Sequence, residues 1–302
     1  MRLAALAGVS LGILSACTGD AGLPFVSLEP PLDVATPDSA PTDRLRVGIA
    51  PVLSAIPSFE QYNPLVEWLA TEIGRPTAYV QRGTYHEINE LTRRGAVDLA
   101  FICSGAWLLN GEGLELLAVP VIHGAPTYKA VCLTQAHRGA SGFEDLRGAT
   151  FGFTDTLSFT GRTYTRARLA QLGTTPEAFF ERTVQVEGHD VLIHLLATGE
   201  VDGGCVNSVV FDHFAADEPE LMSTLAVFER SSPFGSPPVV VSEKLDPQLR
   251  STLLKALTSL DEDPEGKALV AGLHIDRFIT PPAGLYDDAR TFLAVLDDVV
   301  EP

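Results

Sequence analysis

Two ten-residue segments that lie far apart in the chain share one pattern, and this repeat constrains the fold most strongly. The segments read GAVDLAFICS at 95–104 and GEVDGGCVNS at 199–208. Each has a glycine, an aspartate three positions later, an apolar or small-residue run, and a polar residue before the next helix-forming stretch. A near-continuous apolar run is typical of a strand buried on both faces. The repeat predicts two similar lobes, each with a buried strand that leads into a helix.

Strands and helices are predicted to alternate along the rest of the chain. Thr84 and Glu87 form a capping box, which opens a helix with Tyr85 at its first position. Apolar residues between Ser58 and Ile73 recur at helical spacing. We therefore expect an α/β fold in which mainly parallel sheets are flanked by helices. Further strand-like runs lie at 44–50, 78–81, 116–122, 128–134 and 183–187.

Residues that directly follow strands are candidates for ligand binding. In open α/β sheets, ligands bind beyond the carboxyl ends of the strands, where helix N-termini present free N–H groups. Ser104 and Asn207 take this place after the two repeated strands, and Tyr85 lies at another helix start. These three residues are therefore candidates for the ligand site.

The segment 150–173 combines a strand, a polar turn and a helix start. Thr150–Phe153 is predicted to be a strand, and a helix is predicted to begin near Ser158. The free N–H groups and positive dipole end of that helix, together with the hydroxyls of Ser158 and Thr160, have the chemistry of an anion site. Ser158 can equally be only the N-cap of the helix, and the segment leaves both interpretations open.

The charge balance and the motif content exclude several classes of function. The chain has 302 residues, a formal net charge of −18 and no basic stripe, so we expect no nucleic-acid partner. An anion site in such a chain has to work through local dipoles and hydrogen bonds. The body of the chain, 44–302, has no G-x-S-x-G motif, the chain has no CxxC, and His189 and His194 lack the spacing of a zinc helix. We therefore expect a protein that is not an enzyme and needs no cofactor or metal.

The first 43 residues carry the features of an export signal and a tether. Residues 1–16 have one positive charge and an apolar run, and the sequence LSAC that ends at Cys17 resembles the bacterial lipobox. An ordinary signal peptide that happens to contain a cysteine is the alternative. The segment 17–43 is rich in proline and polar residues, as a solvated tether is. We expect a periplasmic protein whose only membrane attachment is a lipid on Cys17.

Three cysteines remain after Cys17, at Cys103, Cys132 and Cys205. Three residues cannot all pair within one chain, so at least one must be a free thiol. All three lie in apolar, strand-like contexts, where a cysteine also serves as a small buried hydrophobic residue. The sequence leaves open whether any two of them are bonded.

The body of the chain, about 44–300, resembles the periplasmic solute-binding proteins of phosphonate, phosphite and phosphate import systems. Nearly the whole chain after the tether takes part in the resemblance. The motifs that carry it are VGIAP at 47–51, VDLAF at 97–101, DTLSFTG at 155–161, EGHDVLIHLLATGEVDG at 187–203 and SPFGSPPVVVSEKLDP at 232–247.

The resemblance implies a two-lobed periplasmic binding protein of type II. In that fold two strands cross between the lobes, and the lobes close on the ligand. Lobe 1 would span 44–130, lobe 2 would span 131–230, and 231–302 would return through the hinge and place the C-terminal helices on lobe 1. The resemblance further implies a monomer that binds a small phosphorus oxyanion and delivers it to an ABC permease.

The anion loop of this family is matched in the segment 155–161. The family pattern is Asp, two residues, Ser, one residue, Ser or Thr, and Gly. Asp155, Ser158, Thr160 and Gly161 fit it. By resemblance, the hydroxyls of Ser158 and Thr160 donate hydrogen bonds to the oxyanion, and Tyr85 also contacts it.

A second segment of the family lines the cleft and matches His189 and Asp190 here. In binders of aminoalkyl phosphonates, the acid of this segment and a second acid near the position of Asp212 hold the ammonium group. This sequence departs from the family at Phe159, where some members have a third hydroxyl, and at Ile102–Cys103, where some have an aromatic residue. These departures favour a smaller or different oxyanion.

The same resemblance extends to periplasmic proteins that sense arsenite with a cysteine in the cleft. A thiolate is a soft ligand that suits As(III), and Cys103 follows a strand at a plausible cleft position. The alternative function is therefore an oxyanion sensor that uses Cys103 and signals to a membrane histidine kinase.

Overall fold

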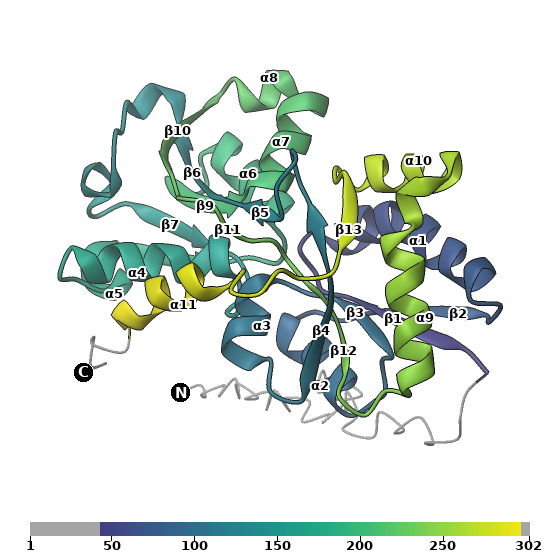
Figure 1. Cartoon of the computed structure of the whole chain (residues 1–302). Helices are drawn as coiled ribbons and strands as arrows, with labels where there is room; N and C mark the ends of the chain where they lie inside the picture. The colour runs from purple at the N-terminus through teal and green to yellow at the C-terminus, as the bar shows by residue number, and fades with distance from the viewer. Residues whose placement is uncertain (1–42, 297–302) are drawn as a thin grey trace, which may run out of the picture. The chain divides into compact units, whose positions relative to one another are not determined.

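The computed structural model describes residues 43–296, which belong to a single unit of the chain. Two separate sheets define two lobes within this unit (Figure 1). The sheet of lobe 1 has six strands in the order β13-β4-β12-β3-β1-β2. Its strands are β1 (Leu45–Ile49), β2 (Thr77–Gln81), β3 (Leu99–Phe101), β4 (Leu114–Val121), β12 (Val239–Ser242) and β13 (Arg277–Ile279).

Helices cover both faces of the lobe 1 sheet. On one face, α1, α9 and α10 bury an apolar core with residues such as Leu65, Leu69 and Leu253. On the other face, α2 begins with the predicted capping box, because Thr84 Oγ1 accepts from Glu87 N–H and the Glu87 carboxylate accepts from Thr84 N–H. The helices of this lobe are α1 (Ala55–Glu72), α2 (Tyr85–Arg93), α3 (Ser104–Asn110), α9 (Pro247–Thr258), the 3-10 turn η4 (Leu260–Glu262) and α10 (Pro264–Gly272).

The sheet of lobe 2 has five strands in the order β10-β6-β9-β7-β8. These are β6 (Ala130–Gln135), β7 (Thr150–Phe153), β8 (Arg182–Gln185), β9 (Gly203–Asn207) and β10 (Leu225–Arg230). Its helices are α4 (Tyr164–Gln171), α5 (Pro176–Phe179), α6 (His189–Thr198), α7 (Ser208–Asp217) and α8 (Pro219–Met222), with 3-10 turns η1 (Ala136–Arg138) and η2 (Phe143–Leu146). The repeated segments occupy equivalent places, since β3 leads into α3 and β9 leads into α7.

The prediction of a two-lobed α/β fold is confirmed, but both sheets contain more antiparallel pairing than expected. The parallel pairs are β1–β2, β1–β3, β7–β8 and β7–β9. The antiparallel pairs are β12 with β3 and β4, β13 with β4, and β6 with β9 and β10. Most of these antiparallel strands adjoin the connections between the lobes. They run antiparallel because a chain that returns from the other lobe enters the sheet from the opposite end.

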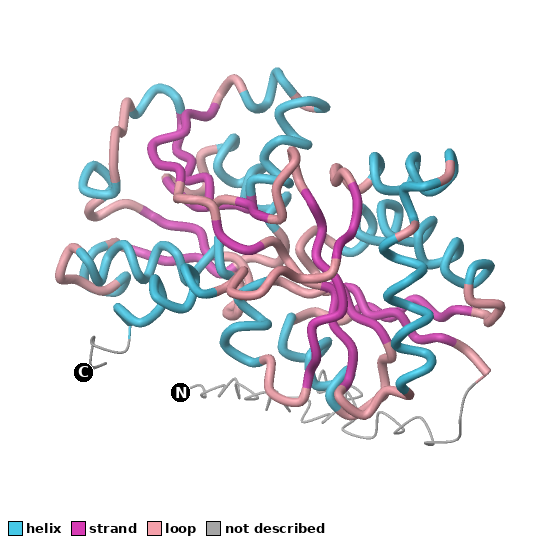
Figure 2. Tube along the Cα trace, in the orientation of Figure 1, coloured by secondary structure: helices cyan, strands magenta, loops and turns pink. Residues whose placement is uncertain are grey.

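Two extended segments join the lobes through β5 (Thr127–Tyr128) and β11 (Phe234–Gly235), which pair with each other as antiparallel strands (Figure 2). A third passage follows β13 and leads to α11 (Asp287–Leu293) and the 3-10 turn η5 (Ala294–Leu296). On this passage the Tyr286 hydroxyl donates to the Ser236 carbonyl at 2.7 Å. The two expected strand crossings are thus β5 and β11, and the passage to α11 is an additional connection that the sequence did not predict.

The last helix packs on lobe 2, whereas the sequence-based expectation placed all C-terminal helices on lobe 1. The Phe292 ring stacks on the Tyr164 ring of α4 with a centroid distance of 5.3 Å, and it also contacts Phe159. Helices α9 and α10 do lie on lobe 1. The segment 231–302, to which the C-terminal helices were assigned, extends partly outside the described residues.

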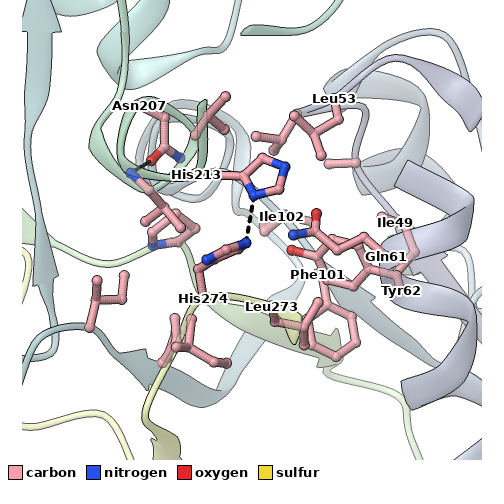
Figure 3. A pocket seen from close by; sticks show the side chains of 18 of the residues that line it. Ile49, Leu53, Gln61, Tyr62, Phe101, Ile102, Asn207, His213, Leu273 and His274 are labelled. Atoms are coloured by element: carbon pink, nitrogen blue, oxygen red, sulfur yellow. Dashed lines mark hydrogen bonds between the residues drawn. The ribbon is translucent and has the colours of Figure 1, made fainter. Parts of the chain in front are cut away.

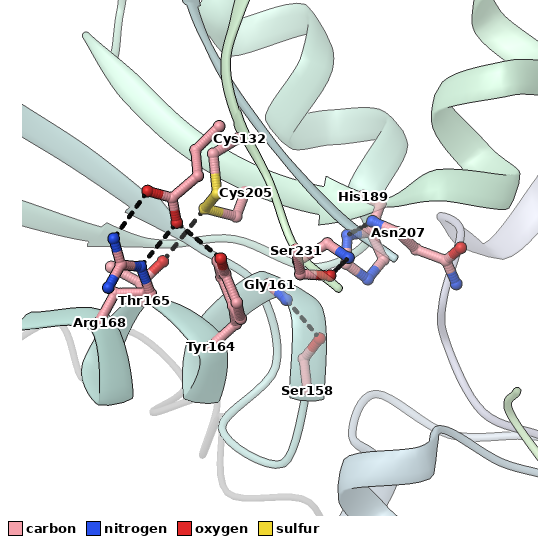
Figure 4. The surroundings of a disulfide bond; sticks show 12 residues. Cys132, Ser158, Gly161, Tyr164, Thr165, Arg168, His189, Cys205, Asn207 and Ser231 are labelled. Atoms are coloured by element: carbon pink, nitrogen blue, oxygen red, sulfur yellow. Dashed lines mark hydrogen bonds and ion pairs between the residues drawn. A yellow bond between two sulfur atoms is a disulfide. The ribbon is translucent and has the colours of Figure 1, made fainter. Parts of the chain in front are cut away.

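Cys132 and Cys205 form a disulfide between directly opposite positions of β6 and β9 (Figure 4). Cys103 is a free and buried thiol. The pairing that the sequence left open is thus the one between neighbouring strands of lobe 2. The signal peptide, Cys17 and the tether lie outside the described residues. Within 43–296, no helix has the length and apolarity needed to cross a membrane.

Candidate ligand site between the lobes

The predicted anion loop connects β7 to α4 through a π-helical turn, η3 (Phe159–Thr163). Ser158 caps this turn, because its Oγ accepts a hydrogen bond of 3.1 Å from Gly161 N–H (Figure 4). A hydroxyl that accepts still has its own proton to donate. The cap interpretation is therefore correct, and it leaves the Ser158 hydroxyl able to act as a donor to an anion.

Phe159 faces away from the ligand region and belongs to the core. Its ring is fully buried and meets the Phe234 ring edge-on, with the centroids 4.8 Å apart. Phe159, at which the sequence departs from the family pattern, thus anchors the loop to the hinge strand β11.

Thr160 and Gly161 lie in a tightly packed part of the loop. Thr160 Oγ1 is buried and has no hydrogen-bond partner among the described residues. A Cβ atom on Gly161 would lie 1.8 Å from Thr154 Oγ1 and 2.9 Å from the His189 ring. Only glycine fits here, so the loop backbone approaches the first turn of α6 directly.

Lobe 1 contributes a buried cluster of four polar groups, Tyr85, Cys103, Ser104 and Tyr128. The Ser104 and Tyr128 hydroxyls are 2.5 Å apart, and the Tyr85 hydroxyl has no hydrogen-bond partner in the described part of the chain. Burial raises the pKa of both phenols well above the ordinary value and Cys103 adds to the rise, whereas the neighbouring hydroxyls, Ser158 beside Tyr85 and Ser104 beside Tyr128, oppose it. Both tyrosines therefore keep their protons and act as neutral donors.

Burial also raises the pKa of the Cys103 thiol, although the N–H groups of Phe159, Gly105 and Ala106 oppose the rise. The thiol is therefore protonated near neutral pH. This state does not favour the thiolate chemistry that an arsenite ligand requires.

The two lobes touch at this cluster. A Cβ atom on Gly105 would lie 2.3 Å from the Leu157 carbonyl oxygen and 2.6 Å from the Phe159 nitrogen. The first turn of α3 therefore packs directly against the backbone of the anion loop. The sequence-predicted residues Tyr85, Cys103, Ser104, Ser158 and Thr160 are brought to the interface between the lobes from opposite sides.

Two carboxylates of lobe 2 cap helices of lobe 1. Asp190 accepts from the Ser54 backbone N–H at 2.9 Å and from the Ser54 hydroxyl, at the start of α1. Asp155 accepts from the Tyr85 backbone N–H at 3.0 Å, at the start of α2. Asp190 is thus engaged with protein donors, whereas the resemblance implied contact with a ligand ammonium group.

His189 lies beside Asp190 and is neutral. Burial lowers the pKa of its imidazole to about 3. Its Nδ1 accepts from Asn207 N–H at 3.3 Å, so the ring proton is on Nε2 and is available for donation. Asn207 itself caps α7, since its Oδ1 accepts from Val209 N–H at 2.7 Å.

A cavity of about 80 Å³ lies next to this cluster, between the lobes (Figure 3). Of the predicted site residues, only Asn207 lines it, while the others lie in packed contact nearby. His213 and His274 also line it and were not found from the sequence; their Nδ1 and Nε2 atoms are 2.6 Å apart. No sequence motif includes both, because His213 is on α7, His274 is in a loop of lobe 1, and the two meet only in the folded protein.

Asp212, the expected second acid, pairs with His123 at 3.2 Å on the exposed side of α7 and does not line the cavity. Among residues 43–296 there is no group of three His, Cys, Asp or Glu side chains arranged to hold a metal ion.

Comparison with known proteins gives one consistent result. Residues 47–286 match the family model of ABC transporter, phosphonate, periplasmic substrate-binding proteins. The phosphate-import protein PhnD of Mycolicibacterium smegmatis is 27% identical over 172 residues, which cover 53% of this chain and 54% of the relative. The chain thus matches about half the length of that curated relative.

Solved structures share the fold. A binding protein component of an ABC phosphonate transporter from Pseudomonas aeruginosa has a TM-score of 0.78 at 20% identity, covering 86% of this chain and 90% of the other. PhnD1 of Prochlorococcus marinus in complex with methylphosphonate has a TM-score of 0.74 at 18% identity, covering 85% and 99%.

These relatives are binding components of transporters, which confirms the prediction that the chain is not an enzyme. The comparisons give no support to the sensor alternative. The family model covers most of the chain, including both repeated strands and the anion loop. The chain therefore belongs to the periplasmic substrate-binding proteins of phosphonate ABC transporters.

Proposed function

We propose that this protein captures a phosphorus oxyanion, which is a phosphonate, phosphite or phosphate, between its lobes and delivers it to an ABC permease. The observation that carries the proposal is the pair of buried hydroxyls, Tyr85 from lobe 1 and Thr160 from lobe 2, that lack a partner among the described residues. A buried donor left unpaired costs about 1–3 kcal/mol. An anion between the lobes would accept a hydrogen bond from each of the two hydroxyls and so remove this cost at both.

The surrounding groups suit an oxyanion held by neutral donors. Ser158 retains a hydroxyl proton, and the neutral His189 has its proton on Nε2. Ser104 and Asn207 begin helices at the carboxyl ends of β3 and β9, where N–H groups favour negative charge. Gly161 lets the loop backbone come close to the His189 ring. Such fixed donors in a water-poor interface bind anions without a cationic side chain.

Binding requires the lobes to separate and close again. Asp155 and Asp190 hold lobe 2 to the helix starts of lobe 1. We infer that Asp155 moves away from α2 when the lobes separate. The backbone N–H of Tyr85, which donates to Asp155 without ligand, then donates to the incoming anion. The protein then acts as a monomer that is anchored by a lipid on Cys17, and its tether lets it reach the permease.

The relatives support both phosphate and phosphonate as ligands, because one is named for phosphate import and another was solved with methylphosphonate. Phosphite belongs to the same chemical class. The raised pKa of the buried Cys103 thiol speaks against arsenite.

Thermal unfolding of the purified protein tests the proposal. We expect phosphate, phosphite or methylphosphonate to raise the melting temperature, since a ligand at a hundred times its Kd adds about 2.7 kcal/mol of stability. Tyr85→Phe should reduce the shift, whereas Tyr79→Phe, a matched change on β2 outside the site, should not. An arsenite shift that requires Cys103, with none from phosphorus oxyanions, would favour the sensor alternative.

A further inference from the structure

The cavity between the lobes shares its walls with the proposed oxyanion site. Ile102 lines the cavity and directly precedes Cys103 of the polar cluster. Asn207 lines it, and its backbone N–H donates to the His189 ring. The backbone N–H of His189 donates to the carbonyl of Val52, a third lining residue, at 2.8 Å. A ligand whose oxyanion meets Tyr85 and Thr160 would therefore have its remaining atoms beside this cavity.

The walls of the cavity suit an uncharged group. They are mainly aliphatic and aromatic, with residues such as Leu53, Phe101, Val210 and Phe278. None of the described residues that line it is Asp, Glu, Lys or Arg. The Tyr62 phenol stays protonated, because burial raises its pKa to about 12. An ammonium group in this space would have no negative partner.

The acids near the site are engaged elsewhere, and Asp217, which is exposed, lies 3.5 Å from Nδ1 of the lining residue His213. Asp190 accepts from the backbone and the hydroxyl of Ser54. Asp212 pairs with His123 on the exposed side of α7. Recruiting either acid would require breaking these contacts, and a charged tail would still have to pass the apolar walls.

The volume of the cavity sets the size of the group. A single water needs about 10–15 Å³ of such space, so a cavity of about 80 Å³ has room for only a few heavy atoms. His213 and His274 both line it and meet through their 2.6 Å contact (Figure 3). An unbranched chain of about two to four carbons matches this room.

We propose that the preferred ligand is an alkylphosphonate whose short uncharged tail lies in this cavity. The inference rests on the proposed function, and it deepens that function by assigning the substituent on phosphorus. Inorganic phosphate and phosphite would leave the cavity unfilled. Aminoalkyl phosphonates would place a charge against apolar walls.

Calorimetric titration of the protein with a series of ligands tests the inference. The series is phosphate, then methyl-, ethyl-, propyl- and butylphosphonate, and 2-aminoethylphosphonate. Burial of one methylene is expected to lower Kd about fourfold. We expect affinity to rise from methyl to propyl and to stop rising where the chain no longer fits. The aminoethyl ligand should bind at least tenfold more weakly than propylphosphonate.

A variant with a larger side chain in the cavity wall tests the role of the cavity directly. Val210→Phe adds bulk to the cavity wall, and should abolish the gain with chain length while phosphate and methylphosphonate still bind. Val227→Phe, on the exposed side of β10, is the control and should leave the series unchanged. The series on the unmodified protein decides the matter even if Val210→Phe fails to fold.

The outcomes separate the two proposals. Equal affinity along the series, or tighter binding of the aminoethyl ligand, overturns the inference and leaves the oxyanion function standing. Failure of every phosphorus compound to bind overturns the proposed function, and the inference with it.

Discussion

The Asp155 carboxylate accepts a hydrogen bond of 3.0 Å from the backbone N–H of Tyr85, so a residue of lobe 2 caps the first turn of α2 in lobe 1. Asp190 and Ser54 form the equivalent contact at α1. Each contact satisfies a helix N-terminus, and each places a negative charge where an anionic ligand would otherwise meet free N–H groups. The protein thus uses its own carboxylates to hold the lobes together without ligand.

Replacing Asp155 with asparagine tests this arrangement. The amide oxygen can still accept from Tyr85 N–H, but the charge at the helix start is lost, which we expect to cost about 1 kcal/mol of unfolding free energy. Oxyanion affinity should rise, because a competing carboxylate is removed. Denaturant titration and calorimetry measure the two effects. Asp263→Asn, which alters the cap of α10 within lobe 1, should lower stability alone. Reduced affinity of Asp155→Asn for oxyanions would contradict the interpretation.

The Tyr85 hydroxyl predicts effects of opposite sign on stability and binding. It is buried and unpaired in the described structure, so Tyr85→Phe should raise the unfolding free energy by about 1 kcal/mol. The same change should weaken oxyanion binding about tenfold or more, because a donor is lost. Tyr128→Phe is the contrast, since it breaks the 2.5 Å contact with Ser104 and should lower stability. A loss of stability in Tyr85→Phe would show that the hydroxyl is paired in the absence of ligand.

His189 predicts how stability depends on pH. Burial lowers the pKa of its imidazole to about 3 in the folded protein, against about 6.5 when unfolded. The unfolded state therefore binds the proton first, and the stability contribution is complete above pH 6.5 and falls as the pH drops toward 3. Between pH 6.5 and pH 5 the loss should be about 2 kcal/mol.

The variant His189→Gln isolates this effect from the titration of carboxylates. Its unfolding free energy should change less between pH 7 and pH 5 than that of the original protein, by about 2 kcal/mol. Equilibrium denaturation at both pH values measures the difference. Equal losses in the two proteins would mean that His189 is accessible to protons in the folded state.

Local patterns were enough to predict the elements that carry the site. The capping box at Thr84 and the buried strands of the two repeated segments depend on neighbours in sequence, and they form as expected. The mixed strand pairing and the third passage could not be predicted, because they depend on where distant segments enter a sheet. The stacking of Phe292 on Tyr164 leaves no periodic signal in the sequence.

The cleft itself was harder to predict for the same reason. The contact of His213 with His274 and the engagement of Asp190 with Ser54 each join residues of different lobes. The resemblance identified Asp190 as a cleft residue but gave no indication that its carboxylate accepts a hydrogen bond from the Ser54 backbone N–H. Which groups remain free for a ligand depends on tertiary contacts rather than on residue type.

The aromatic contacts of Phe292 predict that α11 stabilises lobe 2. The Phe292 ring packs against Phe159, Tyr164 and Phe234. Because it is only partly buried, Phe292→Ala should cost about 1–3 kcal/mol, less than a fully buried phenylalanine. Phe59→Ala, at an exposed position of α1, is the control and should cost less. Equal stability of Phe292→Ala and the original protein would indicate that α11 is not docked in solution.

The disulfide between Cys132 and Cys205 predicts a large loss of stability when both residues are replaced by alanine. The bond closes a loop with a sequence separation of 73, for which the chain-entropy model gives about 4 kcal/mol at 25 °C. Both positions are fully buried in the sheet of lobe 2, so the double variant also loses packing. Urea denaturation with and without a reductant measures the effect, and reduction should lower the stability of the original protein but not that of the double variant. Cys103→Ala retains the bond, and should remain sensitive to reductant. If reduction left the original protein unchanged, the bond would contribute nothing to the stability of the lobe.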